Sequence, residues 1–164
     1  MGKFTSDEYY RYVRMYQNKG TIGLEKLLKG EGFSVKKIER MVRDTEIYTK
    51  SMEKYITFSP KYLDKPVYRG IFIEKEEIKG IFKKGLTQDT LGTSSWTSTL
   101  RQAQEKGNVI FKIMKNKVGT SIRHMSKWTI ENEIIFSKNI KFKILKAPKQ
   151  IGEEWSWIVE VMEV

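Results

Sequence analysis

The sequence predicts an α+β fold in one domain spanning residues 1–164, with a helical N-terminal part (1–60) and a β-rich part (61–164). In the first part, apolar side chains recur at the spacing of a helix. After Pro60 the pattern changes to short strand-like segments separated by turns. No internal repeat, linker or low-complexity segment divides the chain. Helices followed by a run of strands are typical of α+β proteins with antiparallel sheets.

The helical part should contain three segments. Residues from Thr5 to Glu8 have the spacing of a capping box ahead of YYRYVRMYQ, and Gly20 ends that segment. A short helix then runs to Gly30, and the longest one begins at Ser34. The apolar positions of this last helix are expected to be core: Val35, Ile38, Met41 or Val42, Tyr48, Met52 and Tyr55.

The β-rich part begins with the strand VYRGIFI, which is entered through Pro66. A short helix in KEEIKGIFKKG, a turn-rich stretch leading into a strand at SSWTS, and a helix ending at Gly107 follow. Four further strands are expected in the segments NVIFKIMK, WTIENEIIF, IKFKIL and EWSWIVEVMEV.

The composition limits the kinds of site and partner. The chain has no cysteine and one histidine, His124, so a zinc site is not expected. No apolar run is long enough for a membrane span, and the N-terminus lacks the apolar core of a secretory signal, so a cytoplasmic protein is expected. The protein is also expected to be a monomer. The formal net charge of +11 suits nucleic acid, anionic small molecules or an acidic protein, as well as a merely solvated basic surface.

Three short motifs stand on or beside the expected strands. In VYRG, Arg69 lies between apolar neighbours, where a guanidinium requires an anion or a solvated face. In SSWTSTL, a hydroxyl-rich strand turns into a helix at Thr99, so Ser98 or Thr99 can also act as the helix N-cap. In WTIENEIIF, Glu131 and Glu133 are two residues apart and so point to the same side of a strand. Two carboxylates that close raise each other's pKa, which costs free energy. The alternative is that both are exposed on an edge strand, where they discourage pairing with another strand.

Taken together, these motifs resemble the arginine-serine-glutamate class of mono-ADP-ribosyltransferases, in the order and spacing of that family over roughly the last hundred residues. The residues that carry the resemblance are Tyr68, Arg69 and Gly70, Trp96 to Thr99 with Ala103 following, and Glu131 to Glu133. One departure is Leu100, where the family usually has serine. Because Ser98 corresponds to the functional serine, activity is still expected, although Ser94, Ser95 and Thr97 are close alternatives for that place. The family fold would be two packed antiparallel sheets with NAD in the cleft between them.

The resemblance assigns a role to each motif. Glu133 would stabilise the oxocarbenium-like ribose formed when neutral nicotinamide leaves NAD, a reaction that needs no general acid. Ser98 would orient this carboxylate, and Arg69 would bind the pyrophosphate. Tyr68, Gly70 and Thr99 would complete the NAD site, with the Gly70 backbone meeting the nicotinamide amide. NAD would be the co-substrate, and no metal is implied.

The same resemblance suggests the acceptor. A first glutamate, here Glu131, accompanies arginine-directed transfer in the family, because a carboxylate can orient the guanidinium. Trp128 lies in the segment that the family uses to contact its target, although a core tryptophan is an equal alternative. The implied partner is a target protein, which would be a host protein if the enzyme is of the bacteriophage type.

Three other functions stay open on the sequence alone. ADP-ribosylation of nucleic acid would use the same residues and is favoured by the net charge. NAD hydrolysis without transfer would also need Glu133. A non-catalytic basic module that binds nucleic acid would leave Arg69, Ser98 and Glu133 unexplained.

Overall fold

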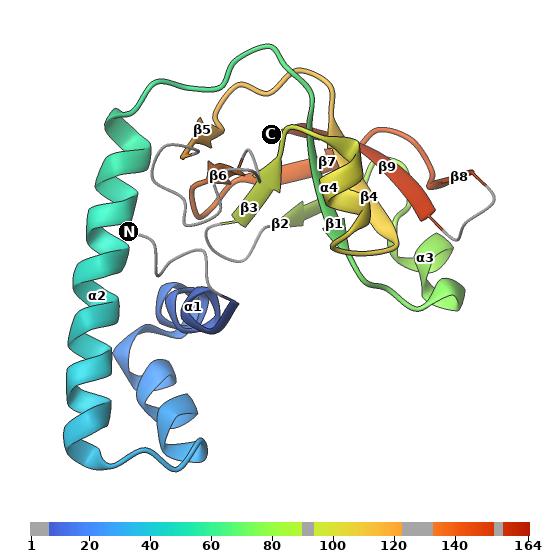
Figure 1. Ribbon diagram of the computed structural model, residues 1–164. Coiled ribbons are helices and arrows are strands. Elements are labelled where there is room, and N and C mark those ends of the chain that lie inside the picture. Colours follow the sequence, from blue (N-terminus) through green and yellow to red (C-terminus); the bar gives the residue numbers. More distant parts are fainter. Residues whose placement is uncertain (1–6, 90–93, 123–132, 153–155) are drawn as a thin grey trace.

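The computed structural model describes residues 7–89, 94–122, 133–152 and 156–164 (Figure 1). Two long helices come first and all the described strands follow them, so the predicted α+β class is confirmed. The helices are α1 (Asp7–Gly30), α2 (Val35–Phe58), α3 (Lys75–Ile81) and α4 (Leu100–Gln104). The strands are β1 (Val67–Ile71), β2 (Thr87–Asp89), β3 (Ser94–Thr97), β4 (Val109–Ile113), β5 (Thr120–Ser121), β6 (Glu133–Phe136), β7 (Lys141–Ile144), β8 (Lys149–Ile151) and β9 (Ser156–Glu163).

Helix α1 is two helical segments joined at a sharp bend. Gly20 has a φ of 65° at the bend, a backbone conformation that glycine adopts without steric cost. The predicted break at Gly20 is therefore confirmed. The bend lets both segments pack on the long helix α2, which lies beside them in Figure 1. Their shared core consists of Tyr12, Leu24, Leu28, Ile38 and Val42.

The strands of the described residues form one sheet in the order β2-β7-β9-β4-β1-β3-β6-β5, and β8 also pairs with β9, at the beginning of that strand. All pairs are antiparallel except β4 with β9, which run parallel. The sheet has two sections, because β1 and β3 are joined by the single pair Tyr68 and Thr97. The expected pair of antiparallel sheets is thus a mixed sheet whose two sections meet at this one contact.

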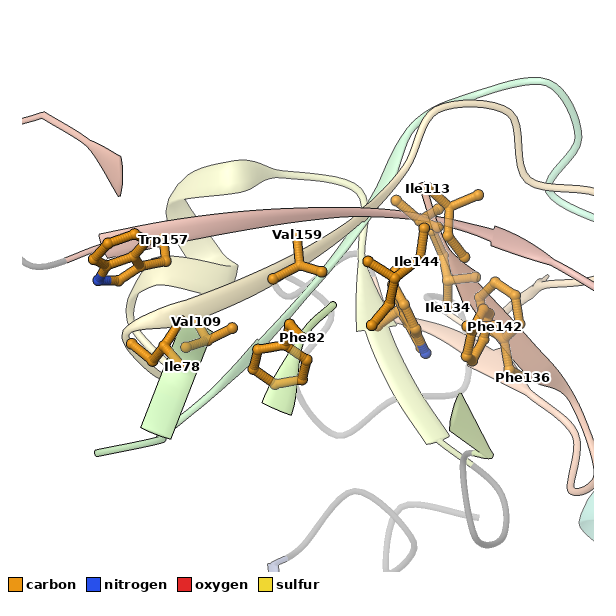
Figure 2. Close-up of a cluster of buried hydrophobic side chains, with 13 residues drawn as sticks. Ile78, Phe82, Val109, Ile113, Ile134, Phe136, Phe142, Ile144, Trp157 and Val159 are labelled. Carbon is orange, nitrogen blue, oxygen red and sulfur yellow. The ribbon is translucent and has the colours of Figure 1, made fainter. Parts of the chain in front are cut away.

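The main core lies on one face of this sheet and is centred on aromatic residues (Figure 2). The ring of Trp96, on β3, lies 5.1 Å from the rings of both Phe136 and Phe142, which come from β6 and β7. Val159 and Ile144 extend the cluster along β9 and β7. Burial of these side chains holds the two sections of the sheet together although few backbone hydrogen bonds join them.

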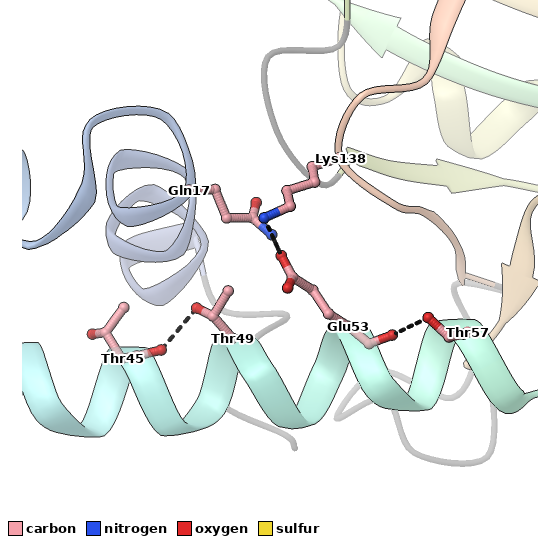
Figure 3. A network of polar contacts seen from close by, with 6 residues as sticks. All are labelled: Gln17, Thr45, Thr49, Glu53, Thr57 and Lys138. Atoms are coloured by element: carbon pink, nitrogen blue, oxygen red, sulfur yellow. Dashed lines mark hydrogen bonds and ion pairs between the residues drawn. The ribbon is translucent and has the colours of Figure 1, made fainter.

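The two long helices cover the section of the sheet that carries β6. Ile135 of β6 packs with Val13 of α1 and Met52 of α2 in a second buried cluster. A polar contact reinforces it: Glu53 of α2 accepts a hydrogen bond from Gln17 at 3.0 Å and lies 3.4 Å from the ammonium group of Lys138 (Figure 3). The helical N-terminal part therefore supports the strand that begins with Glu133.

Helix α4 and the turn that follows it lie directly against β1, which is possible because a glycine stands at each of the two close contacts. A Cβ atom at Gly70 would lie 1.9 Å from the carbonyl oxygen of Ala103. A Cβ atom at Gly107 would lie 2.2 Å from the backbone of Ile71. Such a close approach of two backbones excludes any side chain at these positions.

Within the described ranges, none of the helices has the length and apolar character needed to cross a membrane.

Candidate active site

Glu133 is the first residue of β6, and it is buried, with 5% of its surface exposed. The hydroxyl of Ser95, on the neighbouring strand β3, donates a hydrogen bond of 2.6 Å to its Oε1 atom. A buried carboxylate is costly unless hydrogen-bond donors satisfy it. The serine bond both reduces this cost and fixes the direction of the carboxylate, which is the arrangement needed to act on a developing positive charge.

The register of the strands places further polar residues beside Glu133. Thr97 of β3 is directly opposite Glu133 of β6, and it is also opposite Tyr68 of β1. Because cross-strand partners share a face and side chains alternate, Tyr68, Thr97, Ser95 and Glu133 lie on the same face of the sheet. The row crosses the point at which β1 and β3 meet, so these residues border the junction of the two sheet sections.

Ser98 and Thr99 follow β3 in the turn that leads into α4. Thr99 is the N-cap residue of α4, as the sequence suggested. Its hydroxyl donates to the side-chain oxygen of Gln102 at 2.9 Å, and the hydroxyl of Thr97 donates to the same oxygen. Ser98 thus lies between two threonines that are held by one side chain, next to the row that contains Glu133.

Arg69 lies in the middle of β1, opposite Phe111 of β4. It lines a pocket of about 180 Å³ together with Arg14, which comes from α1. The other lining residues are Ile71, Gln88, Asp89, Trp96, Phe111, Phe142, Ile144 and Val161. Two guanidinium groups above an apolar wall suit an anionic ligand, because the low polarity of the wall strengthens electrostatic attraction.

Tyr10 of α1 connects these two arginines. Its hydroxyl oxygen accepts a bond of 3.5 Å from Arg14, whose guanidinium also lies 5.5 Å from the centre of the tyrosine ring. The pKa of Arg69 is lowered from its ordinary value mainly by burial, and further by the nearby charge of Arg14, while interaction with Tyr10 opposes the shift. The lowered pKa means that the charged form of Arg69 is less stable in this pocket than in water, so its burial reduces the free energy of unfolding.

Arg69 and Glu133 belong to different sections of the sheet, and Tyr10 of α1 is near both of them. Tyr10 interacts with Arg69, and it packs against the buried cluster that contains Ile135 of β6. Tyr68, which precedes Arg69, shares the row with Glu133. The junction between β1 and β3 is therefore the place where both motifs meet.

Gly70 lies so close to the backbone of α4 that no side chain fits there. Packing therefore requires glycine at this position, in addition to the expected contact of its backbone with nicotinamide. Glu131, Trp128 and His124 lie outside the described residues. Among the residues that are described, no cluster of three or more histidine, cysteine or acidic side chains is arranged to hold a metal ion.

Three polar residues of the site did not stand out in the sequence. Ser95 was only a close alternative to Ser98, and the alternation within SSWT could have favoured it, since Ser95 and Thr97 share a face. Tyr10 and Arg14 are four residues apart in a tyrosine-rich helix, so they face the same way. Their spacing was visible, but only the packing of α1 beside β1 brings them to Arg69.

No protein-family model and no curated protein matches the chain. Solved structures do match. The Vis toxin, an ADP-ribosyltransferase from Vibrio splendidus, aligns with 99% of this chain and 70% of its own at a TM-score of 0.69 and 17% identity. Plx2a, an ADP-ribosyltransferase toxin from Paenibacillus larvae, aligns with 97% of this chain and 87% of its own at a TM-score of 0.60 and 19% identity.

The ADP-ribosyltransferase HopU1 of Pseudomonas syringae is 22% identical at a TM-score of 0.55. Its match covers 64% of this chain, which spans 47% of the HopU1 chain. Identities this low establish the fold and leave the activity to be argued from the site. The resemblance suggested by the three motifs is confirmed at the level of the whole architecture: this chain has the ADP-ribosyltransferase fold.

Proposed function

We propose that the protein is an NAD-dependent mono-ADP-ribosyltransferase that modifies arginine side chains of a target protein. The observation that carries the proposal is the buried carboxylate of Glu133, held by the hydroxyl of Ser95 within an ADP-ribosyltransferase fold. A carboxylate oriented in a water-poor site stabilises a cationic sugar more strongly than one in bulk water.

The chemistry requires little besides this group. Nicotinamide leaves NAD as a neutral molecule when the bond to ribose breaks, so no acid has to protonate it. The positive charge remains on the ribose, where Glu133 would stabilise it and accept a hydrogen bond from a ribose hydroxyl. The acceptor nitrogen then forms the new bond to the same carbon, and a proton passes from the acceptor to solvent.

The pocket beside Arg69 supports binding of the pyrophosphate. The guanidinium groups of Arg69 and Arg14 both line it, and each can donate two hydrogen bonds to phosphate oxygens. An extended dinucleotide lying across the junction of β1 and β3 would bring its pyrophosphate to Arg69 and its ribose to Glu133. Exoenzyme S from Pseudomonas aeruginosa, whose structure was determined with Carba-NAD, shares this fold at a TM-score of 0.55.

Arginine is the proposed acceptor because Glu131 lies two residues before Glu133. In a strand this spacing would place both carboxylates on one side, so that one could orient a guanidinium while the other stabilises the ribose. The structure of Vis in complex with agmatine, a compound that carries a guanidinium group, is consistent with such an acceptor for this fold.

The test is the release of nicotinamide from NAD, measured with and without agmatine. We expect release by the wild type that rises with agmatine, and a loss of about 10²–10³-fold in Glu133→Gln. Glu131→Gln should lose transfer to agmatine and keep NAD hydrolysis. Glu105→Gln, which changes an exposed carboxylate that pairs with Arg101, is the matched control and should behave as the wild type. Equal loss of both activities in Glu131→Gln would contradict the division of roles.

A nucleic-acid acceptor is the second candidate, and the net charge of +11 favours it. Incubation with labelled NAD and either cell protein or nucleic acid separates the two. Label that appears only on nucleic acid would overturn the arginine assignment and keep the transferase activity. Release of nicotinamide without any labelled acceptor would identify the protein as an NAD hydrolase.

A further inference from the structure

We propose that an exposed face of the sheet beside the candidate active site docks the acceptor protein, by binding an acidic segment of that protein that also carries apolar side chains. This proposal rests on the proposed function, because the docked protein would be the one that receives ADP-ribose. The lysine–methionine face is formed by β4, β7 and β9 with the residues that follow β4 and β9, and its members are Lys112, Met114, Lys141, Lys143, Met162 and Val164.

These strands turn one face to the core and the other to solvent. Ile113 of β4 and Ile144 of β7 belong to the main core (Figure 2). Since side chains alternate along a strand, their neighbours Lys112 and Lys143 point to the opposite face. Met162 of β9 is the cross-strand partner of Lys143 and therefore lies on that outer face as well.

The apolar side chains of the lysine–methionine face are exposed to solvent. Met114 is 52% exposed, Met162 42% and Val164 61%. Ile113 and Val161 are partners in the parallel pair of β4 with β9. Met114 and Met162 follow them directly and are therefore neighbours. Adjacent exposed methionines suit a binding surface, because their flexible side chains adapt to the apolar groups of a partner.

Two lysines of this face carry charges that the protein itself does not balance. Lys112 is opposite Glu160, but the carboxylate of Glu160 lies 2.7 Å from the ammonium group of Lys146. Within the part of the chain that the structure describes, neither Lys112 nor Lys143 has an ion-pair partner. Both ammonium groups are therefore available to carboxylates of another molecule.

The sequence shows that positive charge is concentrated in this part of the chain. Residues 106–151 include eleven basic side chains and two acidic ones, Glu131 and Glu133, and so supply nine of the eleven net positive charges. Beside the face, edge strand β2 contributes Asp89, which is opposite Lys141. The lysine–methionine face thus lies in the region that attracts an acidic partner most strongly.

The same face adjoins the candidate active site. Lys112 of β4 is the cross-strand partner of Tyr68 of β1. Tyr68 is opposite Thr97, which is in turn opposite Glu133. Lys112 is therefore three strand spacings from Glu133, or roughly 15 Å along the sheet. An extended segment of about five residues spans that distance, so a protein docked on the face can present an arginine to the site.

The chemistry of the face favours a protein over nucleic acid. Ammonium groups attract carboxylates and phosphates alike. Methionine and valine bury the apolar side chains of a protein partner, whereas surfaces that bind single-stranded nucleic acid use aromatic side chains on which bases stack. A segment in which carboxylates alternate with large apolar side chains matches the lysines and the methionines at once.

The test uses two synthetic peptides that share one arginine and a linker of about six glycine and serine residues, which is long enough to reach the site. In the acidic peptide the linker leads to a segment of alternating aspartate and leucine, and in the control peptide asparagine replaces each aspartate. Transfer of ADP-ribose is measured for both peptides and for agmatine, and binding is measured by fluorescence anisotropy without NAD. We expect the KM and the Kd of the acidic peptide to be roughly tenfold lower than those of the control peptide, with a smaller difference at high salt.

Two double variants test the face itself. Lys112→Gln/Lys143→Gln should remove most of the preference for the acidic peptide. Met114→Ser/Met162→Ser should raise the Kd of that peptide by roughly 3–10-fold, because apolar area is lost from the contact. Both variants should keep transfer to agmatine, which is too small to reach the face from the site.

Lys36→Gln/Lys54→Gln is the matched control, because it removes two exposed lysines of α2. It should bind and modify both peptides as the wild type does. An acidic peptide that binds no better than the control peptide would overturn the inference, and so would an unchanged preference in Lys112→Gln/Lys143→Gln.

A labelled single-stranded oligonucleotide of about twelve nucleotides tests the other kind of partner. If it binds more tightly than the acidic peptide and Lys112→Gln/Lys143→Gln weakens it, the face binds nucleic acid and the inference is overturned. A wild type that releases no nicotinamide and does not modify agmatine overturns the proposed function. The anisotropy measurement needs no catalysis, so the two failures are distinguishable.

Discussion

The hydroxyl of Ser95 donates a hydrogen bond of 2.6 Å to the carboxylate of Glu133 across the strands β3 and β6. The bond joins two of the three sequence motifs. It is made by Ser95, whereas the resemblance of the motifs to the family favoured Ser98. It also explains how a carboxylate with 5% of its surface exposed is tolerated next to the apolar cluster around Ile135.

This bond predicts that Ser95→Ala lowers kcat for nicotinamide release by roughly 10–100-fold, since hydrogen bonds to charged groups contribute about 1.5–3 kcal/mol. Ser98→Ala, at the position expected from the sequence, is the comparison, and the wild-type fold should persist in both variants. Steady-state kinetics and a thermal melt measure the two effects separately. A larger loss in Ser98→Ala than in Ser95→Ala would show that the carboxylate changes its serine partner when NAD binds.

Arg69 is expected to lower the stability of the fold and to strengthen the binding of NAD. Its pKa is lowered by burial, yet a guanidinium stays charged at all ordinary pH values, so the folded state carries the cost of that charge throughout the working range. Arg69→Met is therefore expected to keep or raise the melting temperature and to raise the KM for NAD by roughly 10–100-fold, as for a lost charge-assisted contact.

Arg101→Met serves as the control for the loss of one positive charge, because the Arg101 side chain is 91% exposed on α4. It should change neither quantity. An Arg69→Met variant that unfolds at lower temperature and binds NAD normally would instead assign Arg69 to the architecture of the pocket.

The general architecture was predictable because its signals are local. Helical spacing up to Phe58, the break at Gly20 and the alternation in KFKI each follow from side-chain periodicity within a few residues. The very short strands, such as β2 and β8 with three residues each, have too little pattern to be recognised and exist through their pairing with β7 and β9.

The site was predictable only in part, because its parts are assembled by distant contacts. Arg69 and Glu133 could be chosen from their unusual positions in apolar strands. The parallel pairing of β4 with β9, the packing of α1 beside β1, and hence the presence of Tyr10 and Arg14 beside Arg69, depend on tertiary structure. The choice of Ser95 depends on the register between β3 and β6, which a shift by one residue would reverse.

Gly70 has a packing role and an expected binding role, and the substitution Gly70→Ala separates the two. A Cβ atom there would lie 1.9 Å from the carbonyl oxygen of Ala103, and neither backbone can retreat without moving α4 or β1. Gly70→Ala should therefore lower the free energy of unfolding by about 2–4 kcal/mol, the range of severe overpacking. Gly80→Ala is the matched control: nothing lies within 4 Å of the added atom, and alanine within helix α3 should stabilise the protein by about 0.5–1 kcal/mol. Urea unfolding of both variants measures the difference. If Gly70→Ala kept its stability and lost only nicotinamide release, the glycine would be required for contact with the substrate and not for the packing of α4 on β1.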